Sequence, residues 1–353
     1  MDRQTVTIDT EDDGTRLDRF VRRHLPGINQ GRIEKLLRSG SIRVDGGKAK
    51  SSTRLAAGQD VMMPAAVSTE NPRPAASPAK MDSATVARVR DAVISRGEGW
   101  IALNKPSGLA TQGGAGTRQH VDGALAEAFP DVEKPRLVHR LDRDTSGILM
   151  VATTLAASRE LARAFQSHDH DKTYLALVLG VPRPYQGLID APLAKRGGKR
   201  DGGGHEKMTI DHEQGQHART LYHVIEPMGK AASLVALRPL TGRTHQLRAH
   251  MAAIGCPVLG DGKYGGSEAF PHASITRLCL HAAHLVLHNG TAISAALGDD
   301  LGPAFAFFGL DQQAALKRRQ TRTCLQRSRH DSSKTFLEKG YSRSGGYRLF
   351  DLS

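Results

Sequence analysis

Residues 65–85 restrict the fold of this chain more than any other segment. They are rich in alanine, proline and serine, and they contain Asn71-Pro72-Arg73-Pro74 and Ser77-Pro78. This composition is typical of a linker that builds no core of its own. The 353-residue chain is therefore expected to form two units with separate cores. The predicted parts are a small unit over 1–64, the linker over 65–85, a main domain over 86–310 and a basic, disordered tail over 311–353.

The small N-terminal unit is predicted to combine short strands with two helices. Apolar residues between Leu17 and Leu25 recur at helical spacing, and Pro26-Gly27 ends that helix. Asp45-Gly46 is a strong hairpin turn signal. The predicted elements are a strand over 5–8, helices over 17–25 and 30–39, a strand over 42–44 and a completing segment over 55–61.

The second of these helices carries three cations on one face. Arg32, Lys35 and Arg38 recur every three residues, opposite the apolar side. A solvated amphipathic helix would give the same spacing. The complete pattern over 14–64, however, resembles the S4 RNA-binding domain. The matching segments are Arg16-Leu17-Asp18-Arg19-Phe20, Arg32-Ile33-Glu34-Lys35-Leu36 and Ile42-Arg43-Val44-Asp45-Gly46.

The S4 resemblance implies that the unit binds RNA through Arg19, Arg32, Lys35 and Arg38. A short rigid helix would present these cations to phosphates, which position RNA without reading its sequence.

The main domain contains many strand-like runs and few helical ones. This pattern predicts an α+β domain on a mixed, mostly antiparallel β-sheet with flanking helices. Gly197-Gly198 and Gly202-Gly203-Gly204 mark a polar insertion within residues 195–217. The predicted strands are 100–104, 148–153, 174–179, 218–225 and 233–237, and the predicted helices are 156–166 and 245–254.

The segment from Leu137 to Gly147 is the densest cluster of charge beside an apolar strand. It reads Leu-Val-His-Arg-Leu-Asp-Arg-Asp-Thr-Ser-Gly. Charges in such a place are costly unless they are paired or used. The residues alone allow an ion-paired surface loop, a metal site that uses His139, Asp142 and Asp144, or a catalytic carboxylate with positioning arginines.

This segment and three others, in the same order, resemble the RluA-type pseudouridine synthases. The Gly113–Gly116 stretch and the Arg-Asp-Thr-Ser-Gly sequence look closest to the RluC-like branch, which acts on large-subunit ribosomal RNA. The other matching segments are Leu103-Asn104-Lys105-Pro106-Ser107-Gly108-Leu109, Lys172-Thr173-Tyr174-Leu175-Ala176-Leu177-Val178 and Thr241-Gly242-Arg243-Thr244-His245-Gln246-Leu247-Arg248-Ala249-His250-Met251.

The resemblance implies a reaction that isomerises uridine to pseudouridine in RNA and needs no cofactor or metal. Asp142 matches the family's catalytic carboxylate, Arg248 the cation that keeps it ionised, and Tyr174 the active-site phenol. Because a stacked base cannot be reached, the target must be flipped out, and the motif places Arg140 to enter the vacated space. Arg243, His245 and Gln246 are the further expected RNA contacts.

Composition is compatible with an RNA partner. The net charge is +13, which favours polyanions through counterion release. Residues 312–353 hold ten Lys and Arg against three Asp and Glu, although a solvated tail with no specific partner is equally compatible.

We expect a cytoplasmic monomer with no membrane contact. The chain has three cysteines without paired spacing, no apolar run of about 20 residues and no signal-peptide pattern.

One other interpretation stays open, and one possible metal site is set aside. A catalytically silent RNA-binding or ribosome-assembly factor could use the S4-like unit and the basic tail alone. The cluster of Cys279, His281, His284 and His288 lacks the spacing of a zinc site, and the leucines between these residues favour a strand.

Overall fold

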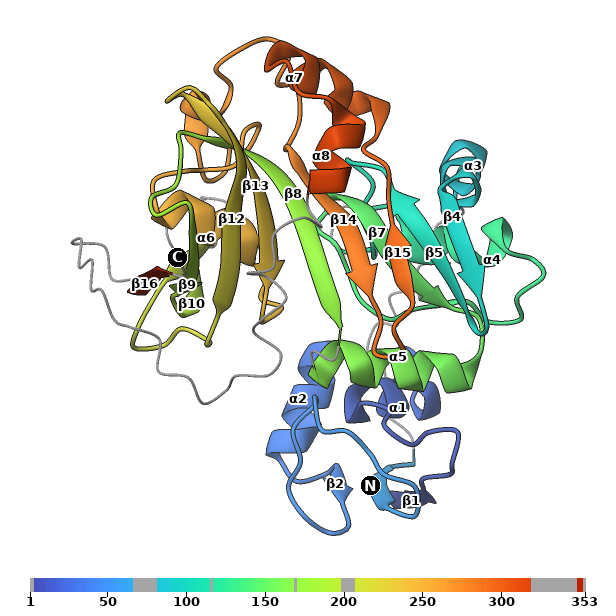
Figure 1. Ribbon diagram of the computed structural model, residues 1–353. Helices are drawn as coiled ribbons and strands as arrows, with labels where there is room; N and C mark the ends of the chain where they lie inside the picture. Colours follow the sequence, from blue (N-terminus) through green and yellow to red (C-terminus); the bar gives the residue numbers. More distant parts are fainter. Residues whose placement is uncertain are drawn as a thin grey trace. The chain divides into compact units, whose positions relative to one another are not determined.

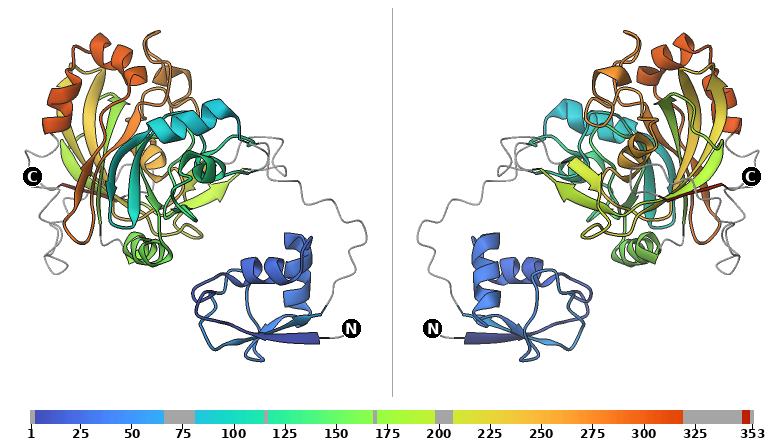
Figure 2. Two further views of the ribbon diagram at one scale, coloured as in Figure 1. Left: turned by 90° about the vertical axis from the view of Figure 1, so that its right-hand side faces the viewer. Right: turned by 90° about the vertical axis from the view of Figure 1, so that its left-hand side faces the viewer.

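The computed structural model (Figure 1) divides the chain into two compact units, residues 1–79 and 80–353. Figure 2 shows both units from two further sides. The described residues are 3–65, 81–114, 117–167, 170–197, 207–318 and 348–351.

The N-terminal unit combines a three-stranded antiparallel sheet with two helices. β3 (Asp60–Pro64) lies between β1 (Arg3–Thr7) and β2 (Arg43–Val44). The helices α1 (Leu17–His24) and α2 (Gln30–Arg38) share one buried core with this sheet. Both predicted helices are confirmed.

The last strand of this unit begins later than predicted. The sequence placed a completing segment over 55–61, whereas β3 begins at Asp60. Residues 56–59 turn instead, because Gly58 takes a φ of 86° and the Gln59 N–H bonds the Ala56 carbonyl at 3.1 Å. The turn carries the chain from buried Leu55 into the strand.

The predicted basic face lies on the outside of the unit. Arg19, Lys35 and Arg38 are exposed, and Arg32 is half-buried. The apolar residues Ile33, Leu36 and Leu37 of α2 face the core. Helix α2 therefore presents its three cations in the arrangement that the spacing predicted, and Arg19 of α1 is exposed as well.

The larger unit is built on an eleven-stranded sheet of the described residues. Its pairs are antiparallel except for β14 beside β7, so the sheet is mixed and mostly antiparallel, as predicted. All five predicted strands are confirmed. Along the sheet the order is β16 (Arg348–Asp351), β9 (Gln186–Asp190), β12 (Arg219–Met228), β13 (Ala232–Pro239), β8 (Asp171–Leu179), β14 (Leu280–Val286), β7 (Ser146–Ala152), β5 (Trp100–Lys105) and β4 (Val93–Gly97), with β15 (Ala292–Ser294) beside β14 and β6 (Arg136–Leu137) beside β7.

Strand β7 packs on both faces, since successive side chains of a strand point to opposite sides. Leu149 and Val151 join the larger core, whereas Ile148 and Met150 join a second core with Leu161 of α5. The helices of this unit are α3 (Ser83–Asp91), α4 (Val121–Ala128), α5 (Leu155–Ser167), α6 (Gln246–Ala253), α7 (Gly302–Phe307) and α8 (Gln312–Arg318).

The folded part of the larger unit extends beyond both predicted boundaries. Met81 is buried ahead of α3, inside the predicted linker, and Ala315 of α8 is buried in the core, inside the predicted tail. Within the predicted insertion, β10 (Leu193–Arg196) pairs with β11 (Lys207–Ile210), and residues 198–206 lie outside the described part. Most of the basic tail, 319–347, lies outside it as well. No helix among the described residues is long and apolar enough to cross a membrane.

Replacement of Gly147 by alanine should destabilise the larger unit. Gly147 has a φ of 109°, and an added Cβ would lie 2.3 Å from the Ala282 carbonyl oxygen where β7 meets β14. Backbone strain and the clash together should lower the free energy of unfolding by about 2–5 kcal/mol. Denaturant titration measures the change.

The matched control is Gly290→Ala, which has a positive φ of 85° and no heavy atom within 4 Å of the added Cβ. It should cost about 1–2 kcal/mol. Equal losses for the two variants would show that the close approach of the strands does not matter.

Candidate active site

The loop that carries Asp142 is held by side chains from the end of β5 and from the segment that follows it. The buried Lys105 ammonium donates to the carbonyls of Pro106, Leu109 and Arg143 at 2.8, 2.8 and 3.0 Å. The same burial lowers the pKa of Lys105 to about 7. The loop of residues 138–145, between β6 and β7, is thus tied to the rigid sheet.

Two hydroxyl groups complete this attachment. The Thr111 hydroxyl donates to the Leu141 carbonyl at 2.7 Å and accepts from the Leu141 N–H at 3.2 Å. The Ser107 hydroxyl donates to the Asp144 carbonyl at 2.8 Å. The backbone on both sides of Asp142 is therefore fixed, which sets the direction of its carboxylate.

Arg248 faces Asp142 from helix α6. Its Nη1 lies 3.9 Å from Asp142 Oδ2. The same guanidinium makes two parallel hydrogen bonds of 2.7 Å to Asp261, whose side chain is fully buried. Burial lowers the pKa of Arg248, but the hydrogen bonds and charge of Asp261, together with the charges of Asp142 and Tyr264, raise the pKa above its usual value, so the cation persists. Asp261 thus keeps the positively charged guanidinium of Arg248 in place beside Asp142.

His245, just before α6, approaches the same oxygen of the carboxylate as Arg248. Its Nε2 is 3.8 Å from Asp142 Oδ2, and its Nδ1 is 3.0 Å from the Tyr264 hydroxyl. That hydroxyl also accepts from the Met208 N–H at 3.0 Å. Burial lowers the pKa of His245 more than the Asp142 carboxylate raises it, which favours the neutral ring.

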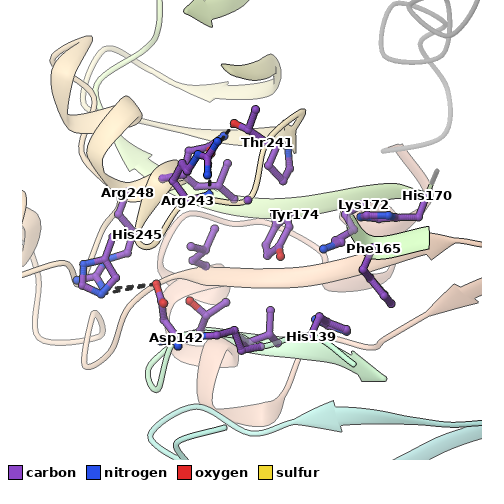
Figure 3. Close-up of a pocket in the computed structure, with 18 of the residues that line it drawn as sticks. His139, Asp142, Phe165, His170, Lys172, Tyr174, Thr241, Arg243, His245 and Arg248 are labelled. Atoms are coloured by element: carbon purple, nitrogen blue, oxygen red, sulfur yellow. Dashed lines mark hydrogen bonds and ion pairs between the residues drawn. The ribbon is translucent and has the colours of Figure 1, made fainter. Parts of the chain in front are cut away.

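The backbone at His245 is unusual for a residue with a side chain. It takes φ 52° and ψ 19°, the left-handed region, just before α6 begins. Strain of this kind gathers at functional sites. It turns the imidazole towards Asp142, as Figure 3 shows.

Tyr174 of β8 occupies the middle of the pocket (Figure 3). The pocket has a volume of about 290 Å³, and Asp142, Tyr174, Arg248 and Arg140 all line it. Burial, and then the negative charge of Asp142, raise the pKa of Tyr174 above its usual value. The phenol therefore keeps its proton at neutral pH.

Apart from Gln246, the remaining predicted residues fall into two groups. Arg140 and Arg243 are exposed on the pocket wall. Arg243 does not pair with Asp142; its guanidinium donates to the His217 carbonyl and the Gln216 side chain, both at 3.0 Å. The four cations of the N-terminal unit belong to the other compact unit.

Gln246 requires a correction. The resemblance assigned it to RNA contacts, but its side chain is only 3% exposed. Its oxygen accepts from the Thr241 hydroxyl and the Arg243 N–H, and its amide donates to the Arg219 carbonyl and the Thr220 hydroxyl. All four bonding positions are used within the protein. Gln246 therefore holds the turn before α6.

Sequence reasoning gave no role to Asp261, Lys105 or Thr111. Lys105 lies in a matched segment, and Thr111 follows that segment closely. A carboxylate in an apolar stretch such as Val258-Leu259-Gly260-Asp261 signals a buried partner, because an unpaired charge there would be costly. Nothing in the sequence identifies that partner as Arg248.

Comparison with known proteins agrees with this site. Residues 99–253 match the family described as RNA pseudouridylate synthase, and residues 15–61 match the S4 domain. A ribosomal large subunit pseudouridine synthase C from Rickettsia bellii is 36% identical over 280 residues, which cover 77% of this chain and 89% of that protein. The protein of that name from Escherichia coli strain K12 is 35% identical over 292 residues, covering 81% and 89%.

A solved structure gives the same assignment. Human RNA Pseudouridylate Synthase Domain Containing 1 is 29% identical with a TM-score of 0.51, covering 65% of this chain and 94% of that one. Fold and site define an RNA-modifying isomerase with an S4 domain. The chain belongs to the RNA pseudouridylate synthase family.

Removal of the Asp261 carboxylate should destabilise the protein strongly. Asp261→Ala leaves a buried guanidinium without its partner, which should cost about 3–5 kcal/mol in the free energy of unfolding. Denaturant titration measures the loss. The control is Asp131→Ala, which breaks the exposed pair with Arg96 and should cost at most about 1 kcal/mol. A loss as small for Asp261→Ala would contradict the importance of the buried pair.

Proposed function

We propose that this protein converts specific uridines of large-subunit (23S) ribosomal RNA to pseudouridine, with Asp142 as the catalytic carboxylate. The observation that carries the proposal is the pocket in which Asp142 meets Arg248 and His245 beside Tyr174. The names of the relatives from Rickettsia bellii and Escherichia coli support the choice of RNA.

The reaction rearranges one nucleotide and adds nothing to it. The N1–C1′ bond breaks, the uracil turns, a C5–C1′ bond forms, and the hydrogen on C5 is replaced by one on N1. A carboxylate suits this chemistry because it can act at the sugar as positive charge develops there and can then help to move a proton. The buried Arg248 places a positive charge 3.9 Å from the Asp142 carboxylate.

Tyr174 would contribute its ring face and its O–H group. Its raised pKa keeps it a phenol, so it can stack on the flipped uracil and donate a hydrogen bond. His245 would help to hold the carboxylate in position together with Arg248. Arg140, exposed at the pocket wall, is placed to fill the space that the flipped nucleotide leaves.

The N-terminal unit would position the RNA. Arg19, Arg32, Lys35 and Arg38 offer positive charge that suits phosphates, and the match to the S4 domain supports this role. We further propose that the protein acts as a cytoplasmic monomer; the ribosomal RNA in the names of its relatives supports the location.

The rival is an RNA-binding assembly factor without catalysis. A silent factor has no need for a carboxylate beside a paired arginine and a strained histidine. Equal rescue of a deficient strain by Asp142→Ala and by the wild type would favour the rival.

Asp142→Asn should abolish turnover and leave RNA binding intact. The amide matches the carboxylate in shape but can neither attack nor accept the proton. The single-turnover rate on unmodified ribosomal RNA should therefore fall by about 10³-fold or more, while the Kd for RNA stays within about threefold. A chemical adduct with primer extension measures the product. A rate within tenfold of wild type would rule out Asp142 as the reactive group.

Loss of two cations from α2 should weaken RNA binding and not chemistry. Lys35→Gln with Arg38→Gln should reduce the slope of log affinity against log salt by about 1.5, because two phosphate contacts are lost. The rate at saturating RNA should stay unchanged. Exposed Lys134 and Lys230 of the larger unit, changed together to glutamine, provide the charge-matched control. The same slope for both pairs would contradict the role of the S4 face.

A further inference from the structure

Lys172 extends the pocket beyond Tyr174. The two residues are separated by one position on β8, so their side chains point to the same side of the strand. Figure 3 shows the order along the pocket: Asp142 at one end, Tyr174 in the middle and Lys172 beyond it. A planar ring that stacks on Tyr174 with one edge at Asp142 would therefore point its opposite edge towards Lys172.

The Lys172 ammonium has N–H groups that are available for a hydrogen bond to a ligand. Its nitrogen lies 4.6 Å from the centre of the Phe165 ring, and within the described part of the chain no carboxylate or carbonyl is paired with it. Burial lowers its pKa to about 8, because a cation away from water is costly unless a ligand or a charge compensates. A hydrogen-bond acceptor on the substrate would provide that compensation.

Uracil has an acceptor at the required position both before and after the reaction. In uridine the ring atom opposite N1 is C4, which carries O4. In pseudouridine the atom opposite C5 is C2, which carries O2. A half-turn about the axis through N3 and C6 exchanges N1 with C5 and C4 with C2. A donor opposite the sugar therefore meets a carbonyl oxygen in both states.

We propose that Lys172 recognises the uracil carbonyl opposite the glycosidic atom, O4 in the substrate and O2 in the product, and so selects uridine. This inference rests on the proposed function. Cytidine carries an amino group where uridine carries O4. Its N–H donors would face the ammonium of Lys172, and two donors cannot satisfy each other. The same contact that guides the turning base would thus exclude cytidine.

The test combines a variant with a substrate analogue. Lys172→Met keeps the length and the packing on Phe165 but removes the donor. The single-turnover rate on RNA with uridine at the target should fall about 10- to 150-fold, as for loss of a charged hydrogen bond. RNA with 4-thiouridine at the target offers a weaker acceptor, so the wild type should react more slowly with it than with uridine. Lys172→Met should treat the two RNAs alike.

Two controls separate recognition from folding. Thermal unfolding of Lys172→Met should occur at the wild-type temperature or higher, since a buried charge is removed. Lys207, whose nitrogen lies 5.0 Å from the centre of the Tyr264 ring, is a second lysine stacked on an aromatic ring. Lys207→Met should stay within about threefold of the wild type on both RNAs.

The outcomes are distinct. Lack of pseudouridine with the wild type would overturn the proposed function and, with it, the role of Lys172. A normal wild type with a Lys172→Met rate within threefold of it would overturn the role of Lys172 alone. So would a variant that loses RNA affinity and salt dependence but still distinguishes 4-thiouridine from uridine, since Lys172 would then contact phosphate.

Discussion

The hydrogen-bonded pair of Arg248 and Asp261 is the interaction on which the site depends. A guanidinium this deeply buried would be unstable alone, and two bonds of 2.7 Å to a fully buried carboxylate hold it. Because Asp261 uses Nε and Nη2, Nη1 stays directed at Asp142. The proposed catalytic carboxylate thus receives a fixed positive charge without forming the closest ion pair itself. It remains available to a substrate.

The protein fixes the two sides of the pocket by different means. Lys105, Thr111 and Ser107 attach the Asp142 loop to the sheet through backbone carbonyls, so the direction of the carboxylate does not depend on bound RNA. On the opposite wall, strain at His245 and the bonds of Gln246 set the start of α6. Preorganised charges of this kind stabilise a reacting centre without rearrangement.

The sequence was informative where the chemistry is local. The spacing of apolar residues predicted α1, α2 and five strands of the large sheet. Residues that bury one face of an element, or both faces, recur at fixed spacing along the sequence. The sequence pattern did not identify interaction partners that lie far apart along the chain. Asp261 joins Arg248 across 13 residues, and Lys105 reaches Arg143 across 38. Gln246 was assigned to RNA because it is polar in a matched motif, but burial gives it a structural role. The burial of Ala315 in the core was not predicted, because the segment around it is basic and was assigned to the tail.

A pseudouridine map of ribosomal and transfer RNA tests the central claim most directly. RNA from cells that lack this protein is compared with RNA from the same cells that carry it, by chemical adduct and primer stop. We predict that specific large-subunit sites gain pseudouridine when the protein is present, while transfer RNA stays unchanged. Identical maps with and without the protein would contradict the proposed function, and new sites confined to transfer RNA would contradict the proposed substrate.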